Sequence, residues 1–320
     1  MVSLVSLVQG SSVRVRVPAS SANIGPGFDS IGLALGIWDE CVVTVSAEPG
    51  LRVEVGGEGA GEVPRDELNL IYRSMVQAWQ RLNVQTPAGL NLSCHNAVPQ
   101  CRGLGSSATS IVAGVVAAQG LSDIAAGRGG AADGDFDRVF TNNLAAALEG
   151  HPDNSSASVF GGMTLSWTDD VDPGQIHTVP LEVNPDVIPL VFVPAAKLST
   201  ASARAVLPAQ VLHASAARNA GRAALLVEAV TRRPDVLLAA TRDWLHQEQR
   251  RPAFPQSMSL LDGLRARGHA AVISGAGPSV LVLTTPAQVE DACAEGDPAV
   301  WRVLQPGVAA AGASLDTIPA

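Results

Sequence analysis

Apolar and polar residues alternate with a period of two in four stretches of the first hundred residues. These stretches are residues 13–17, 41–46, 51–55 and 90–95. Because successive side chains of a strand point to opposite faces, the alternation predicts strands that each bury one face. A helical pattern over residues 70–82 interrupts the series, so we expect one helix before the fourth strand.

The second half of the chain is dominated by helical patterns. The elements expected there are helices over 210–231, 234–249 and 257–267, a buried strand over 190–193, and a hairpin over 270–284. A chain of 320 residues exceeds the size at which a single core stops growing. We therefore expect an α+β fold with two lobes, residues 1–166 and residues 167–320.

The charge balance narrows the class of partner. The formal net charge is −9, and no run of basic residues occurs. Nucleic acid and anionic membrane surfaces are therefore not expected as partners. Of the 21 basic residues only Lys197 is a lysine, so arginine forks are the available ligands for phosphates and carboxylates.

The first residues, the short apolar runs and the cysteines predict a cytoplasmic protein with reduced cysteines. The first residues carry no basic leader, and no apolar run approaches the ~18 residues of a spanning helix. The four cysteines Cys41, Cys94, Cys101 and Cys293 have neither metal-ligand spacing nor the density of a disulfide framework.

A glycine-rich turn, PQCRGLGSSA over residues 99–108, runs into an apolar segment that predicts a helix over 108–119. Gly103 and Gly105 permit positive φ and close backbone approach, the serines are of the helix-capping type, and a helix N-terminus attracts anions. A phosphate site is therefore expected. Residues 122–137 are rich in Gly and Asp and predict a loop, with 127–134 as its most flexible part.

Three other interpretations of this turn are possible. A Walker A loop is excluded, because no lysine follows the glycines. A dinucleotide fingerprint lacks the buried parallel strand before it and the acid-terminated strand after it. An ordinary capped helix after a glycine turn stays open if the motif is taken alone.

Two further glycine stretches lie far from the first: PASSANIGPGFD over residues 18–29 and SGAGPS over 274–279. Together the three resemble the ordered motifs of the GHMP kinases, which phosphorylate small alcohols. EGHPDN over 149–154 and STASAR over 199–204 make the homoserine kinases the most similar branch. The resemblance extends from about residue 13 to residue 283.

This resemblance implies an N-terminal lobe like ribosomal protein S5 domain 2 and a ferredoxin-like C-terminal lobe. The active site would lie between them and use ATP and Mg²⁺, and the protein would be a homodimer. The residues implied to bind ATP are Pro99, Arg102, Gly103, Leu104, Gly105, Ser106, Ser107 and Ala108. Ser107 and Glu149 are implied to hold the metal, although a solvated Glu149 at a helix end is an equal alternative.

The resemblance also implies a site for the amino-acid substrate. The residues implied to bind it are Asn23, Asp29, His151, Asp153, Thr200, Arg204, Arg250 and Gly275. Acids would hold the ammonium group and arginines the carboxylate. The neighbouring Arg251 leaves the second arginine uncertain by one residue. His151 is either a donor that shapes its loop or a proton acceptor.

Asn154 separates two mechanisms, because related kinases for mevalonate and galactose carry there an aspartate that can accept the alcohol proton. An amide cannot ionise. We therefore expect direct transfer, with Asn154, Asp153 and Arg204 as the catalytic residues. The family usually continues Asn-Val-Ala-Pro, whereas residues 155–158 here are SSAS, so the loop that carries Asp153 can differ in shape.

Three functions follow from these observations. The first is ATP-dependent phosphorylation of the hydroxyl of L-homoserine for threonine synthesis. The second is another GHMP kinase, acting on a mevalonate-derived or sugar alcohol, which would have an acid at position 154. The third is a catalytically silent ligand-binding protein with the same fold.

Overall fold

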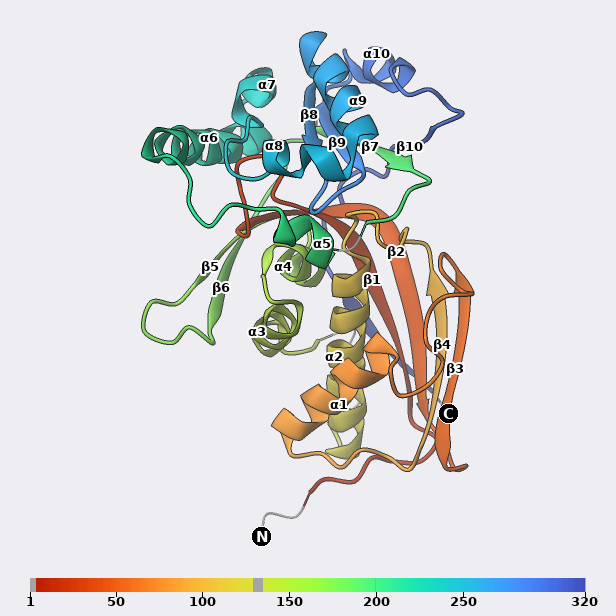
Figure 1. Cartoon of the computed structure of the whole chain (residues 1–320). Coiled ribbons are helices and arrows are strands. Elements are labelled where there is room, and N and C mark those ends of the chain that lie inside the picture. Colours follow the sequence, from red (N-terminus) through yellow and green to blue (C-terminus); the bar gives the residue numbers. More distant parts are fainter. Residues whose placement is uncertain (1–3, 129–134, 199, 320) are drawn as a thin grey trace.

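The computed structural model of the chain describes residues 4–128, 135–198 and 200–319, and it contains two β-sheets flanked by helices (Figure 1). One sheet has seven strands and the other has four. The α+β class and the two-lobe arrangement are therefore confirmed.

The elements have the following bounds. The strands are β1 (Ser12–Ala22), β2 (Ile31–Val45), β3 (Gly50–Gly57), β4 (Gly89–Asn96), β5 (Met163–Thr168), β6 (Ile176–Leu181), β7 (Ile188–Pro194), β8 (Ala270–Ile273), β9 (Val280–Thr284), β10 (Trp301–Leu304) and β11 (Ser314–Ile318). The helices are α1 (Leu70–Leu82), α2 (Ser106–Ala125), α3 (Arg138–Glu149), α4 (Asp153–Phe160), α5 (Thr200–Ala205), α6 (His213–Thr231), η1 (Pro234–Val236), α7 (Leu237–Ala240), α8 (Gln247–Arg250), η2 (Arg251–Ala253), α9 (Pro255–Ala266) and α10 (Val289–Ala294).

The larger sheet has the strand order β11-β1-β2-β4-β3, with β5 paired to β2 and β6 paired to β5. Only β3 and β4 run parallel among these pairs. Valines at alternate positions of β1, such as Val13 and Val15, enter a core shared with α1, α2 and α3. Figure 1 shows these helices gathered on one face of the sheet.

Helix α2 lies within this core and is buried on nearly every side. Among the described residues it is the one helix long and apolar enough to cross a membrane, but 78% of that stretch is buried inside the protein. Gly114 permits its close approach to α1, since a Cβ there would overlap the carbonyl oxygen of Ile71. The Nε1 of Trp79 donates to the carbonyl oxygen of Ala118 at 3.2 Å. Helix α2 is thus a core helix of the N-terminal lobe.

The smaller sheet has the antiparallel order β10-β7-β9-β8. Helix α9 packs on one face through Met258, and α6 and α7 pack on the other through Leu226 and Leu237. The apolar cluster that contains Leu226 and Leu237 continues into the larger sheet at Leu33 and Met163. The two lobes therefore share a buried core.

The chain crosses between the sheets twice, over residues 182–187 and again over 305–313. Strands β6 and β11 both belong to the larger sheet. The expected division between residues 166 and 167 falls inside β5, whereas a division that follows the sheets comes after Leu181. The position of the domain boundary stays a prediction.

Most expected elements are present, and helix α1 has the bounds expected from the pattern. Helix α2 extends to Ala125, into the segment 122–137 that was expected to be a loop. The reason is that Leu121 and Ser122 still face the core, and the Ser122 hydroxyl donates to the carbonyl oxygen of Ala118 one turn earlier. Residues 129–134 of the expected flexible segment lie outside the described residues.

The prediction of a single helix over residues 234–249 is wrong. Helix α7 ends at Ala240, and α8 begins only at Gln247. Between them, the carboxylate of Asp243 accepts hydrogen bonds from the amides of Leu245, His246 and Gln247 at 2.8–3.0 Å. An aspartate that binds nearby amides competes with helix continuation, and here it starts a new turn.

Candidate active site

The glycine-rich turn leads directly into helix α2. Gly105 is the residue that caps the helix, with φ of 72°, and among the described residues no side chain caps the free amides of the first turn. The expectation that a serine caps this helix is therefore wrong, because Ser106 and Ser107 already lie within it. The amides at this end stay available to an anion.

The three glycine stretches meet at this turn. The Ser274 hydroxyl donates to the carbonyl oxygen of Gly103 at 2.6 Å and lies 2.8 Å from the Ser21 hydroxyl. Gly103 has φ of 72°, and a Cβ on it would overlap the carbonyl oxygen of Ser274. The amide of Ser20 donates to the carbonyl oxygen of Leu104 at 3.1 Å. Segments from both lobes thus hold the turn in place.

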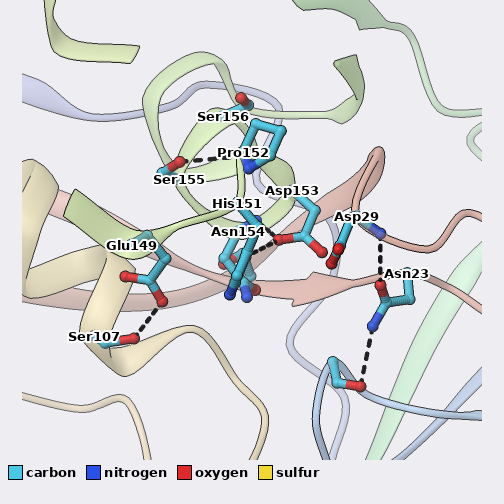
Figure 2. Close-up of polar contacts among 12 residues, drawn as sticks. Asn23, Asp29, Ser107, Glu149, His151, Pro152, Asp153, Asn154, Ser155 and Ser156 are labelled. Carbon is cyan, nitrogen blue, oxygen red and sulfur yellow. Dashed lines mark hydrogen bonds and ion pairs between the residues drawn. The ribbon is translucent and has the colours of Figure 1, made fainter. Parts of the chain in front are cut away.

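Ser107 and Glu149 come together across the entrance to α2 (Figure 2). The Ser107 hydroxyl donates to Glu149 Oε1 at 2.5 Å, and Glu149 Oε2 is buried with no hydrogen-bond partner. Burial raises the pKa of the Glu149 carboxyl, and the Ser107 hydrogen bond opposes that rise. A buried carboxylate oxygen without a partner is a ready ligand for a cation.

The stretch from His151 to Asn154 leads into helix α4, which begins at Asp153. Asp153 is 1% exposed, and its Oδ1 lies 2.6 Å from His151 Nδ1 and accepts the amide of Asn154 at 2.8 Å. Burial disfavours the charged imidazole, but the hydrogen bond to Asp153 and the charges of Asp153 and Glu149 together outweigh it and raise the pKa of His151. Because a carboxylate oxygen accepts hydrogen bonds, His151 Nδ1 donates to Asp153, which agrees with a loop-shaping role for His151. The amide oxygen of Asn154 accepts the Ser20 hydroxyl at 3.0 Å.

Asp29 faces this stretch from the loop between β1 and β2 (Figure 2). Its carboxylate pairs with the Arg204 guanidinium through two contacts, 2.5 and 3.1 Å long. Asn23 supports the loop, because its Oδ1 accepts the amide of Asp29 and its Nδ2 donates to the carbonyl oxygen of Gly275. One ligand atom each of Asp29, His151 and Asp153 lies within 4.8 Å of the others.

Arg250, rather than Arg251, belongs to this cluster. Arg250 is 1% exposed and donates to the carbonyl oxygens of Ala203 and Gly275 at 3.0 and 3.2 Å. Burial, together with the charge of Arg204, lowers the pKa of Arg250 to about 10. Arg251 instead forms ion pairs on the surface with two acids, Glu248 and Asp262.

Arg102 is implied to bind ATP, but its guanidinium is bonded to backbone oxygens in this structure. The Arg102 guanidinium donates to three carbonyl oxygens, those of Gln100, Pro194 and Ala195 at 2.9 Å, and so ties the turn to the smaller sheet. The side chain of Thr200 lies outside the described part of the chain. Pro99, Leu104 and Ala108 are buried beneath the turn.

The structure also adds residues that the sequence reasoning did not single out. Ser20 and Ser274 lie inside the quoted glycine stretches, so their small polar side chains could have been included. Phe28 lies beneath both arginines, with its ring centroid 5.5 Å from the guanidinium carbon of Arg204 and 5.7 Å from that of Arg250. It too lies within a quoted stretch, next to Asp29.

Two α+β lobes with a glycine-rich turn at the start of a buried helix are the arrangement that the resemblance to the GHMP kinases implies. Residues 69–162 match the GHMP kinases N terminal domain, and residues 222–302 match the GHMP kinases C terminal domain. As a GHMP kinase the chain uses ATP.

Within this class the chain is similar to homoserine kinases along nearly its whole length. The chain is 48% identical to the homoserine kinase of Streptomyces avermitilis, covering 96% of this chain and 94% of the relative. It is 44% identical to that of Clavibacter michiganensis, covering 98% and 96%. The crystal structure of homoserine kinase from Cytophaga hutchinsonii has the same fold, with a TM-score of 0.78 at 24% identity, covering 95% of this chain and 97% of that one. The chain belongs to the homoserine kinase branch of the GHMP kinase family.

Proposed function

We propose that the protein transfers the γ-phosphoryl group of ATP to the hydroxyl of L-homoserine, yielding O-phospho-L-homoserine for threonine synthesis. The observation that carries this proposal is the placement of two carboxylates, Asp29 and Asp153, beside Arg204 and close to the glycine-rich turn. An amino acid has both an ammonium and a carboxylate group. A site with acids and a guanidinium side by side complements both.

The substrate would bind as a zwitterion against the Asp29–Arg204 pair. Its ammonium group would lie between Asp29 and Asp153, and its carboxylate would bind Arg204, assisted by Arg250 and Thr200. Charge-assisted, bidentate hydrogen bonds of this kind are about twice as strong as neutral ones. His151 would keep Asp153 oriented, and Asn23 and Gly275 would hold the loop that carries Asp29.

The ATP phosphates would lie against the free amides of residues 103–107 and the N-terminus of α2. Ser107 and Glu149 fit the requirements of a Mg²⁺ site, because one carboxylate oxygen of Glu149 is buried and unpartnered. Bound Mg²⁺ would neutralise charge on the phosphates. The glycines would let the backbone approach those phosphates closely.

The reaction would proceed by direct displacement. The homoserine hydroxyl oxygen forms a bond to the γ-phosphorus, the bond from that phosphorus to the bridging oxygen breaks, and ADP leaves. The alcohol proton passes to a γ-phosphate oxygen or to water. Asn154 cannot ionise, and Asp153 would bind the substrate ammonium, so positioning of the reactants would take the place of a carboxylate base.

A coupled assay of ADP release over a panel of acceptors tests this function. We expect turnover with L-homoserine and none with mevalonate, galactose or shikimate. Turnover with mevalonate or a sugar, but not with homoserine, would show another kinase of the family. Nucleotide binding without turnover on any acceptor would show a silent binding protein.

We also propose that the protein is a cytoplasmic homodimer, which the resemblance to the family supports. Light scattering after size exclusion would then give twice the chain mass of 32.8 kDa. A single chain mass at micromolar concentration would contradict the dimer but not the activity.

A further inference from the structure

A carboxylate outside every motif holds the two ends of the glycine-rich turn together. Asp39 lies on β2, and its Oδ1 accepts hydrogen bonds from the amides of Ala97 and Val98 at 2.8 and 2.9 Å. Its Oδ2 accepts the hydroxyl of Thr109 at 2.6 Å. One side chain thus satisfies three donors.

The three donors belong to opposite ends of the turn. Ala97 and Val98 follow the end of β4 and precede the turn, whereas Thr109 lies in the first helical turn of α2. The Thr109 amide donates to the carbonyl oxygen of Gly105 at 2.9 Å, which is the first hydrogen bond of that helix. Asp39 therefore spans the chain between the strand exit and the helix start.

A different set of contacts holds the middle of the turn, at Gly103 and Leu104. Ser20 binds the carbonyl oxygen of Leu104, and Ser274 binds that of Gly103. These contacts hold the middle of the turn but not the separation of its ends. Within the described residues, Asp39 is the side chain that bonds to both ends.

We propose that Asp39 is a positioning residue that sets the spacing of the phosphate-binding turn, and so raises the affinity for ATP without contacting it. An ionised carboxylate suits this task because it accepts several donors and offers none. An asparagine keeps the shape but is neutral and supplies one acceptor oxygen, so neither end would keep a charge-assisted bond and one end would face an NH2 group in place of an acceptor. The hydrogen bonds that Asp39 makes with described residues go to Ala97, Val98 and Thr109, and none goes to Asp29 or Arg204.

The test compares Asp39→Asn and Thr109→Val with the wild type in steady-state kinetics and in thermal unfolding. We expect the KM for ATP to rise about tenfold in each variant, and the KM for homoserine to stay within about twofold. The double variant should be little worse than either single variant, because each single variant already breaks the link between the two ends of the turn. Thr109→Ser, which keeps the hydroxyl, should restore the wild-type KM.

Glu40→Gln is the matched control, because Glu40 is the next residue of the strand and pairs with Arg14 and Arg16 on the surface. It should leave both KM values unchanged. Burial raises the pKa of Asp39, so the neutral asparagine relieves a desolvation cost that offsets part of the lost hydrogen bonding, and the melting temperature should change little. The proposal is overturned if the KM for ATP stays within twofold in both variants, or if both KM values and the melting temperature shift together.

Discussion

At the scale of single residues, the charged groups of the site occur in defined partnerships. Asp29 is paired with Arg204, Asp153 with His151, and Glu149 with a hydroxyl. Glu149 differs from the other two acids because no positively charged group bonds to it: among the described residues, its buried oxygen has no hydrogen-bond partner. This group should therefore respond most to pH and to Mg²⁺.

The raised pKa of Glu149 predicts the pH dependence of metal use. As the pH falls through that raised pKa, the carboxyl gains a proton and loses affinity for Mg²⁺, so the need for more metal to reach half-maximal rate sets in at a higher pH than it would with a normal glutamate. Ser107→Ala removes the bond that lowers the pKa, so this acidic limb should move to higher pH. Glu149→Gln should abolish the limb. The measurement is the apparent Mg²⁺ affinity across pH, and a limb that Glu149→Gln leaves in place would contradict the assignment.

The same shift has a consequence for stability. The folded-state pKa of Glu149 lies above its unfolded value, so its contribution to stability is present at low pH and is lost as the pH rises through the folded pKa. At neutral pH the ionised group is a cost, and Glu149→Gln should raise the melting temperature of the metal-free protein. A lower melting temperature at pH 7 would show that the carboxylate stabilises the fold.

The Asp29–Arg204 pair predicts a specific effect on substrate binding. Arg204→Ala should raise the KM for homoserine by roughly 10- to 150-fold, the equivalent of about 1.5–3 kcal/mol for charge-assisted bonds, while the KM for ATP changes little. Arg204→Lys should recover only part of this, because lysine lacks the planar fork. Arg251→Ala is the control and should behave as wild type, since its partners are on the surface. An equal effect of both alanine variants would contradict the assignment of Arg204.

At the scale of secondary-structure elements, the site depends on where strands and helices end. Helix α2 begins at the glycine-rich turn, α3 ends at Glu149, and α4 begins at Asp153. Gly150 ends α3 with φ of 88°, and the chain then turns to place His151 and Asp153 beside Asp29. Three helix ends thus converge at one place.

A side chain at Gly103 should lower stability and nucleotide affinity more than the positive φ alone would explain, because the new Cβ would also overlap its neighbours. Gly103→Ala combines a φ of +72° with a Cβ that overlaps Ser274, so we expect at least a ~10-fold higher KM for ATP and a lower melting temperature. Gly307→Ala is the matched control, with φ of +69° and no atom within 4 Å of the new Cβ. It should cost only about 1 kcal/mol of stability and leave the KM values unchanged. Similar losses of nucleotide affinity in both variants would contradict the steric account.

The sequence predicted these elements unevenly, for physical reasons. Helix α1 has one apolar and one polar face, so its bounds could be predicted. Helix α2 is apolar on most sides, and its true end at Ala125 carries no polar signal. The break between α7 and α8 could not be predicted, because a hydrophobic pattern does not show that Asp243 bonds to three backbone amides.

The site could be predicted where its residues lie in recognisable motifs. Asp29, Glu149 and Asp153 were singled out in this way, and the structure brings Asp29 and Asp153 together. Asp39 could not be found, because its partners follow it by 58 to 70 residues and belong to no motif of their own. Only the pairing of β2 with β4 brings those residues near each other.

At the scale of the whole molecule, catalysis would arise from positioning between the two lobes. The N-terminal lobe supplies the glycine-rich turn and Asp153, and residues beyond the first crossing supply Arg204 and Arg250. The shared core through Leu33 and Leu226 keeps these groups in register. On this account the transfer needs no carboxylate base, because the reactants are held in line and their charge is neutralised.

The central claim is that Asp153 binds substrate and is not the base, and the kinetics of Asp153→Asn across pH test it most directly. We predict a KM for homoserine raised about tenfold or more, with kcat at saturation within tenfold of wild type and with the same pH dependence. Loss of a true base would lower kcat by roughly 10²–10⁴-fold. A collapse of kcat with an unchanged KM, or the disappearance of an acidic limb seen in the wild type, would contradict the account.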